Sequence, residues 1–148
     1  MTAPTAPYIR KHILPRLFAV IDGKKDNVID FEEYVCAVAL FRIGTTEEKI
    51  RVLFLMYEPF KGLHLTKDSV RKLLVDATVA IQKEEIHVAT LELWIQEQME
   101  LSECMADMAL VQFSAQDGKL ELQEFIAFVK VEGSVQGLLL QLPDAIDL

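Results

Sequence analysis

Cysteine is scarce in this 148-residue sequence. Its two cysteines, Cys36 and Cys104, lie far apart and lack the spacing of a metal-binding or redox motif. Two are too few for a disulfide scaffold, so we expect a reducing compartment. No apolar run approaches the roughly 20 residues that a membrane-spanning helix needs. We therefore expect an intracellular, cytoplasmic protein that reaches membranes only through a partner.

Basic residues are also in short supply. Lysine and arginine together number 15 against 23 acidic residues, which gives a net charge of −8. A nucleic-acid surface requires the opposite sign, so we expect no nucleic-acid partner. Acidic clusters can instead hold a hard cation, although a solvated acidic surface is the ordinary alternative.

Targeting signals are missing from the first residues. The opening MTAPTAP has no apolar stretch of the kind that a secretory signal contains. Residue 2 is threonine, whereas N-myristoylation requires glycine there. We expect neither kind of processing, and we expect residues 1–7 to form a disordered lead.

Apolar residues make up 51% of the sequence and recur at helical spacing along most of it. The pattern predicts an all-α fold with three helix–loop–helix units, because the same plan recurs. Strand-like residues are limited to two or three in each loop, as in VID, LHL and KLE, which predicts very short loop-to-loop β pairing. The first unit spans 8–43, a pair of units spans 45–132, and an apolar tail occupies 133–148.

Local signals predict several helix ends. Pro15 is acceptable in the first turn of a helix. Thr45, followed by Glu48 three residues on, forms a capping-box pattern. Thr66 is suited to cap the next helix. The pattern then predicts a helix from about Thr90 and a separate short helix over ADMALVQF.

The stretch DGKKDNVIDFEE, residues 22–33, connects two apolar helical runs. Calcium takes six to eight oxygen ligands, and a twelve-residue helix–loop–helix loop supplies them from positions 1, 3, 5, 7, 9 and 12. The predicted metal ligands are the side chains of Asp22, Asp26, Asp30 and Glu33 and the main-chain carbonyl of Val28. Asn27 takes the place of the usual glycine at position 6, because asparagine tolerates left-handed backbone.

Lys24 stands at position 3 of this loop, where an oxygen ligand is expected. An ammonium cannot coordinate a cation and repels it, so water would fill the gap. Two interpretations stay open: a single calcium site of weak or moderate affinity, or an ion-free loop whose acids only cap and solvate the helices. Magnesium is less suited, because it prefers one or two carboxylates together with water or phosphate.

The stretch LPRLFAVIDGKKDNVIDFEEYVCAVALFRIGTTEEKIRVLFLMYE, residues 14–58, resembles the EF-hand proteins of the neuronal calcium sensor, calcineurin B and calcineurin-B-like group. In that family the second EF-hand ends in an FxEF helix, and a Gly-Thr/Ser-x-x-Glu-Lys linker leads to the third. The counterparts here are residues 31–34 and 44–49. The resemblance implies that the family's first hand is missing, so that the hand at 8–43 is unpaired. An upstream hand or a homodimer would then cover its apolar face.

The second and third loops retain few ligands. Counted from Glu58, the second loop offers Phe, Gly and Ser at positions 3, 5 and 12. The carboxylates of the third loop are Asp117, Glu121 and Glu124. We expect both loops to be degenerate and to pair with each other through Leu65 and Leu120.

Several apolar residues at helical spacing are candidates for a partner-binding groove. They are Phe18, Phe41, Phe54, Trp94, Met105, Met108, Leu139 and Leu142. Methionine surfaces adapt to varied partners, although core packing is the ordinary interpretation of such residues. The leucine-rich tail is expected to lie in the protein's own groove or in that of a partner, because exposing each leucine costs about 1.5–3 kcal/mol.

The sequence contains no nucleophile–base pair, no Gly-rich phosphate loop and no three-ligand zinc spacing, so we expect no catalytic residue. It predicts a non-catalytic EF-hand regulatory or adaptor module whose apolar groove takes an amphipathic helix, from another protein or from the same polypeptide. The alternatives are a calcium-independent scaffold and a regulatory domain of a larger enzyme, such as the membrane acyltransferases that contain similar hands.

Overall fold

The computed structural model describes residues 9–58, 64–80, 88–114 and 118–146. The described chain is almost entirely helical, and its β structure is one two-stranded antiparallel sheet. The predicted all-α fold with very short loop-to-loop β pairing is therefore confirmed. The predicted disordered lead, residues 1–7, lies outside the described residues.

The described chain begins with a π-helical turn, η1 (Ile9–Ile13), which leads into α2 (Leu14–Ile21). Pro15 lies in the first turn of α2, where a backbone N–H would have no helical acceptor. After the first loop, α3 (Phe31–Ile43) runs to Gly44. Pro15 thus lies in the first turn of a helix, as the sequence predicted.

The middle of the chain contains α4 (Thr46–Tyr57), β1 (Leu65–Thr66) and α5 (Lys67–Ala80). Thr45 Oγ1 accepts a hydrogen bond from the backbone N–H of Glu48 at 3.1 Å. Thr66 Oγ1 accepts one from the N–H of Ser69 at 3.3 Å. These side chains satisfy N–H groups that the first turn of a helix leaves without an acceptor, so Thr45 and Thr66 both cap helices as predicted. Of the capping box predicted at Thr45, the structure shows the bond that Thr45 accepts.

The longest helix, α6 (Val88–Phe113), is continuous over 26 residues. The sequence predicted two separate helices here, and the predicted break before residue 106 is wrong. Neither glycine nor proline occurs within α6, and residues such as Glu100 and Glu103 have high helix propensity. The helix therefore continues through the segment where the apolar stripe is weak.

The second and third loops meet through one short strand each. β2 (Lys119–Leu120) pairs antiparallel with β1, with Leu65 opposite Leu120 and Thr66 opposite Lys119. Both leucines are fully buried. The predicted loop-to-loop contact through these two leucines is thus present, and it joins the helices before and after each loop into one body.

The last two helices are α7 (Leu122–Val131) and α8 (Gly133–Ile146). Phe125 of α7 lies at the centre of an aromatic cluster, with ring centroids 5.6 Å from Phe54 and 6.2 Å from Phe128. Burial of each such ring contributes about 1.5–3 kcal/mol. The hydrophobic core therefore has its aromatic centre between α4 and α7, next to the paired strands.

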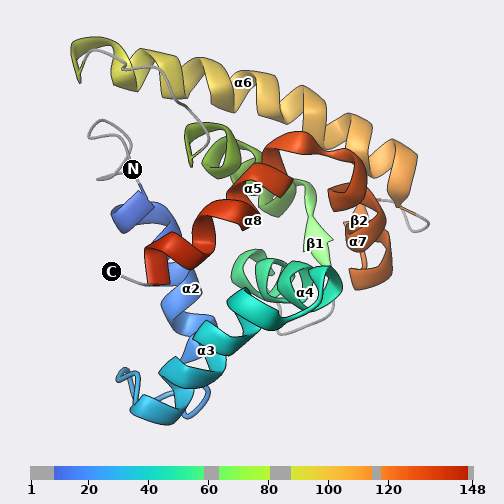
Figure 1. Cartoon of the computed structure of the whole chain (residues 1–148). Coiled ribbons are helices and arrows are strands. Elements are labelled where there is room, and N and C mark those ends of the chain that lie inside the picture. Colours follow the sequence, from blue (N-terminus) through green and yellow to red (C-terminus); the bar gives the residue numbers. More distant parts are fainter. Residues whose placement is uncertain (1–8, 59–63, 81–87, 115–117, 147–148) are drawn as a thin grey trace.

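Figure 1 shows how the helices surround this core. α6 runs across the top of the view and packs on α5, while α8 crosses the middle and also packs on α5. Val135, Leu138 and Leu142 of α8 are buried there. The loop between α2 and α3 lies at the opposite end of the molecule from α6 (Figure 1), and its residues 23–28 are exposed to solvent.

Candidate metal centre

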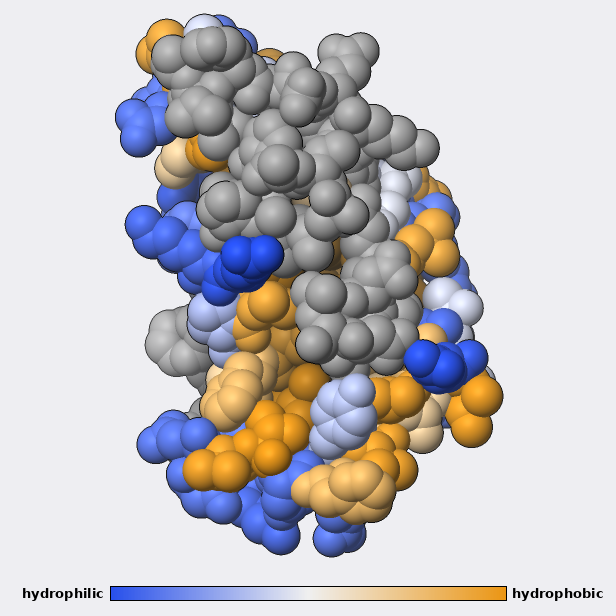
Figure 2. Space-filling view, turned by 60° about the vertical axis from the view of Figure 1, so that its left-hand side comes forward, coloured by the Kyte–Doolittle hydropathy of each residue, from blue (hydrophilic) through white to orange (hydrophobic). Residues whose placement is uncertain are grey.

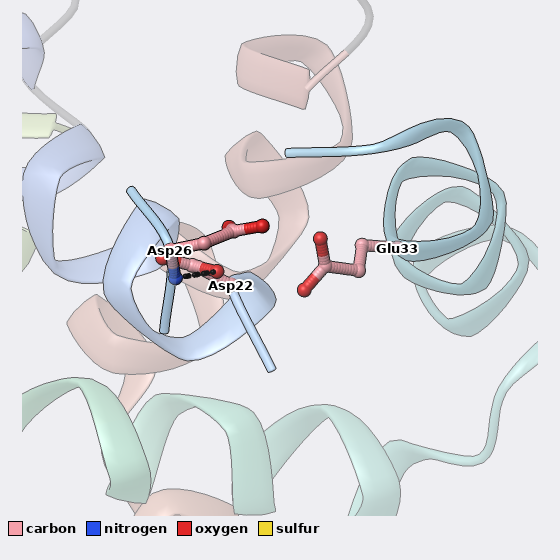
Figure 3. A group of neighbouring side chains, drawn as sticks. All are labelled: Asp22, Asp26 and Glu33. Atoms are coloured by element: carbon pink, nitrogen blue, oxygen red, sulfur yellow. Dashed lines mark hydrogen bonds between the residues drawn. The ribbon is translucent and has the colours of Figure 1, made fainter. Parts of the chain in front are cut away.

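The loop between α2 and α3 brings three carboxylates together. Asp22 and Asp26 belong to the loop, Glu33 belongs to the first turn of α3, and one oxygen of each lies within 4.8 Å of the others. Figure 3 shows Glu33 pointing across the gap toward the two aspartates. Among the described residues, this is the group of His, Cys, Asp or Glu side chains whose geometry suits an ion. Carboxylate oxygens are the ligands that calcium prefers.

The loop backbone fixes the first of these carboxylates. Asp22 is 3% exposed, and its two oxygens accept backbone N–H bonds from Asp26 at 3.3 Å and from Asn27 at 2.9 Å. Burial is the largest influence on this carboxyl and raises its pKa, but the hydrogen bonds together outweigh it, so the pKa is lowered. Asp22 is therefore ionised at neutral pH, as a cation ligand must be.

The turn of the loop passes through left-handed backbone. Lys25 has φ 58° and Asn27 has φ 63°. The second value is the conformation predicted for asparagine in the place of the usual glycine. The N–H of Val28 then donates to Asp26 Oδ1 at 3.1 Å. This tight turn allows Asp22 and Asp26 to approach each other.

Asp30 and Glu33 form a capping box at the start of α3. Asp30 Oδ1 accepts from the N–H of Glu33 at 2.8 Å, and Glu33 Oε1 accepts from the N–H of Asp30 at 3.1 Å. Glu33 Oε2 also accepts from the backbone N–H of Lys24 at 3.1 Å. Reciprocal bonds of this kind hold both side chains in place. Glu33 therefore caps α3 and belongs to the carboxylate group at the same time.

Asp30 lies outside the carboxylate group and is bound by a lysine. Lys24 Nζ donates to Asp30 Oδ2 at 2.6 Å. This hydrogen bond is the main cause that lowers the pKa of the Asp30 carboxyl, and it also raises the pKa of Lys24. Of the four predicted carboxylate ligands, the structure thus brings three together and pairs the fourth with a cation of the same loop.

The other two loops are described only in part, because residues 59–63 and 115–117 lie outside the described residues. Asp117 is among them. At the start of α7, Glu124 Oε1 accepts from the N–H of Glu121 at 2.8 Å. The predicted degeneracy of these loops stays a prediction.

An apolar groove adjoins the first loop. It has a volume of about 440 Å³, and its apolar lining includes Leu14, Phe18, Ile21, Ile29 and Tyr34. Phe18 is 39% exposed and Tyr34 is 44% exposed. Figure 2 shows hydrophobic side chains gathered in the lower part of the molecule, where α2 and α3 lie, with hydrophilic side chains beside them. Exposed apolar surface of this kind is typical of an interface.

The residues predicted to bind a partner fall into two groups. Phe41, Phe54, Leu139 and Leu142 are buried in the core. Phe18, Met105 and Met108 are exposed, and Trp94 is half-buried. Phe18 lines the groove, whereas the other three lie on α6. The structure therefore does not bring the predicted set into one surface.

Sequence reasoning missed four of the apolar groove residues named above, Leu14, Ile21, Ile29 and Tyr34. Helical spacing marks Phe31, Tyr34 and Val35 as one apolar stripe of α3, yet all three are exposed. The available signal was their position in the hand that was predicted to lack a mate. An apolar stripe on such a hand has no second hand to pack against.

Comparisons with known proteins find several relatives, although no family model matches the sequence. A recoverin family protein from Dictyostelium discoideum is 26% identical over 144 residues, which cover 89% of this chain and 63% of that protein. Calcium-binding protein NCSA from the same organism is 36% identical over 58 residues, which cover 39% and 31%. A calcium and calcium/calmodulin-dependent serine/threonine-protein kinase from Lotus japonicus is 27% identical over 128 residues, which cover 86% and 22%.

The chain spans less than two thirds of the length of each of these relatives. In the part of the chain that the structure describes, no helix combines the length and the apolar character needed to cross a membrane. The carboxylate group and the calcium-binding relatives together support calcium as the ion of the first loop. The helical fold, the paired loops and the relatives agree, and together they support an EF-hand protein similar to the neuronal calcium sensors.

Proposed function

We propose that this chain is a non-catalytic regulatory module that binds one calcium ion in its first loop. The observation that carries the proposal is the convergence of Asp22, Asp26 and Glu33 within 4.8 Å. The carbonyl of Val28 is a further proposed ligand, and Asp30 stands at the position of a fourth carboxylate, where its side chain is paired with Lys24. A bound ion would supply a local positive charge that neutralises the mutual repulsion of these carboxylates.

In this proposal, calcium binding changes the shape of the apolar groove beside the loop. Phe18 and Ile21 come from α2, Tyr34 comes from α3, and the loop joins these two helices. An ion held between Asp22 on one side and Glu33 on the other would therefore alter the angle between the walls of the groove. The proposed ligand is an amphipathic helix of a partner, whose apolar face would fill the groove.

A calcium titration tests the first part of this proposal. Calcium is expected to raise the melting temperature, because an ion that binds only the folded state stabilises it. Glu33→Gln is expected to abolish the response. Glu32→Gln is the matched control, since Glu32 is an exposed neighbour outside the carboxylate group. An unchanged melting temperature and unchanged Trp94 fluorescence at millimolar calcium would leave only the calcium-independent scaffold.

The similarity to a plant kinase favours a second candidate, in which the module regulates a larger enzyme. That kinase matches 86% of this chain with 22% of its own length, so the matched segment lies within a much longer polypeptide. The intact mass of the protein isolated from its source decides between the candidates. A mass near 16.8 kDa contradicts the larger enzyme, and a much greater mass supports it.

A further inference from the structure

The four carboxylates at ligand positions of the first loop have different surroundings. Asp22, Asp26 and Glu33 have oxygens within 4.8 Å of one another. Both oxygens of Asp30 are engaged elsewhere: Oδ1 accepts the N–H of Glu33 at 2.8 Å, and Oδ2 accepts Lys24 Nζ at 2.6 Å. The loop thus contains a cation of its own that is already bound to one of the predicted calcium ligands.

The two kinds of contact differ in what they leave for an ion. An oxygen that accepts a backbone N–H keeps a second lone pair, and it can still coordinate a metal. An ammonium instead places a full positive charge beside the oxygen, and this charge repels any other cation that approaches. The contact between Lys24 and Asp30 therefore acts against an ion in a way that the backbone contacts of Asp22 do not.

We propose that Lys24 is an internal competitor that keeps Asp30 from the ion and thereby sets the calcium affinity of the loop. This inference rests on the proposed calcium site. In the wild-type chain the ion is held by three carboxylates, with water in place of the fourth. Removal of the lysine charge releases Asp30, which then becomes the fourth carboxylate and tightens binding, because calcium affinity rises with the number of charged ligands.

Lys25 provides a matched comparison within the same loop. It carries the same charge one residue away, but its Nζ donates to the carbonyl oxygen of Ala19 at 2.8 Å. If the loop charge alone set the calcium affinity, neutralising either lysine would change that affinity equally. An effect that requires the contact with Asp30 would appear only for Lys24.

The experiment is isothermal titration with calcium on four variants of the full chain: Lys24→Gln, Lys25→Gln, Asp30→Asn and the Lys24→Gln/Asp30→Asn double variant. Asparagine caps helices as well as aspartate does, so Asp30→Asn preserves the start of α3. Circular dichroism in chelator checks that each variant is folded before calcium is added. Lys24→Arg is added as a variant that keeps the charge.

Lys24→Gln is expected to tighten calcium binding about tenfold, and Lys25→Gln less than about threefold. Asp30→Asn is expected to change the affinity of the wild type less than about threefold, yet to remove the whole gain in the Lys24→Gln background. Lys24→Arg is expected to bind like the wild type. The terbium ion, used as a luminescent probe, is expected to hold fewer water molecules in Lys24→Gln than in the wild type.

Three results would overturn the inference. If Lys24→Gln and Lys25→Gln tightened calcium binding equally, the effect would be one of general loop charge, and the proposed calcium site would still stand. If Asp30→Asn weakened calcium binding equally in the wild type and in Lys24→Gln, then Lys24 would release Asp30 whenever the ion binds. Calcium binding by neither the wild type nor Lys24→Gln would remove the proposed site and this inference with it.

Discussion

The hydroxyl of Tyr57 donates a 2.5 Å hydrogen bond to Asp76 Oδ2 in the interior of the protein. Tyr57 ends α4 and Asp76 lies on α5, so the bond ties these helices together behind the second loop. The guanidinium of Arg16 lies 4.7 Å from the centre of the Tyr57 ring. A contact of this kind between cation and ring links α2 to the same pair.

We expect Tyr57→Phe to lower the free energy of unfolding by about 1.5–3 kcal/mol, because a buried carboxylate loses the hydrogen bond from this hydroxyl. Urea denaturation followed by circular dichroism measures the change. Tyr34→Phe removes the same hydroxyl from an exposed tyrosine and should change stability by less than about 0.5 kcal/mol. Equal effects of the two substitutions would contradict a specific role for the bond with Asp76.

Gly44→Ala is expected to destabilise the protein by about 1–3 kcal/mol. A Cβ at this position would lie 2.3 Å from the carbonyl oxygen of Leu40, and backbone cannot move away as a flexible side chain can. Gly133→Ala is the control, because a Cβ there meets nothing within 4 Å. Thermal melting of both variants tests the contact, and a neutral Gly44→Ala would refute it.

The Leu65 and Leu120 pair gives a prediction about the core. Both side chains are fully buried at the paired strands, so Leu120→Ala should lower the free energy of unfolding by about 2–5 kcal/mol. Leu140→Ala makes the same substitution at a leucine that is 79% exposed, and it should cost far less. Chemical denaturation measures both changes, and equal stability of the two variants would contradict the prediction.

The calcium-free protein should lose stability at its first hand in acid. The pKa of Asp30 is lowered in the folded state, chiefly by the hydrogen bond from Lys24. Its contribution is therefore complete above the unfolded value of about 3.9, and it is lost as the pH falls through the lower folded pKa. Melting in chelator between pH 7 and pH 2 measures this loss, and Asp30→Asn should flatten the acid limb relative to the wild type.

The apolar groove should bind an apolar dye in a calcium-dependent manner. Phe18→Ser is expected to reduce the fluorescence of bound dye by more than half, because it removes a wall of the groove. Met108→Gln removes an apolar side chain that is 70% exposed on α6, and it should leave the calcium response unchanged. If Met108→Gln rather than Phe18→Ser reduced the calcium-dependent dye fluorescence, the binding surface would lie on α6 instead.

The local features of the loops could be predicted from sequence, because they depend on neighbouring residues. The cap at Thr45, the left-handed backbone of Asn27 and the pairing of Leu65 with Leu120 all follow from residue type at a known spacing. The converging carboxylates follow from the same spacing. Helix–loop–helix units can therefore be predicted from the sequence without knowledge of any tertiary contact.

The remaining features depend on contacts between distant segments. Helical spacing cannot distinguish a stripe that faces the core, such as that of Phe54, from one that faces solvent, such as that of Tyr34. It also could not show that α6 is continuous. The pairing of Lys24 with Asp30 depends on how the loop folds back on itself, which residue spacing does not fix.

The bridge between β1 and β2 also bears on how quickly the protein reaches its native state. It joins two short segments that α5 and α6 separate in the chain, so a long stretch must close before the leucines meet. Closure of such a stretch costs entropy ahead of the contacts that offset it, and non-local pairing of this kind slows folding. If this bridge forms at the rate-limiting step, truncation of Leu65 or Leu120 should slow refolding after dilution from denaturant. If the bridge forms later, the same truncations should leave the refolding rate unchanged.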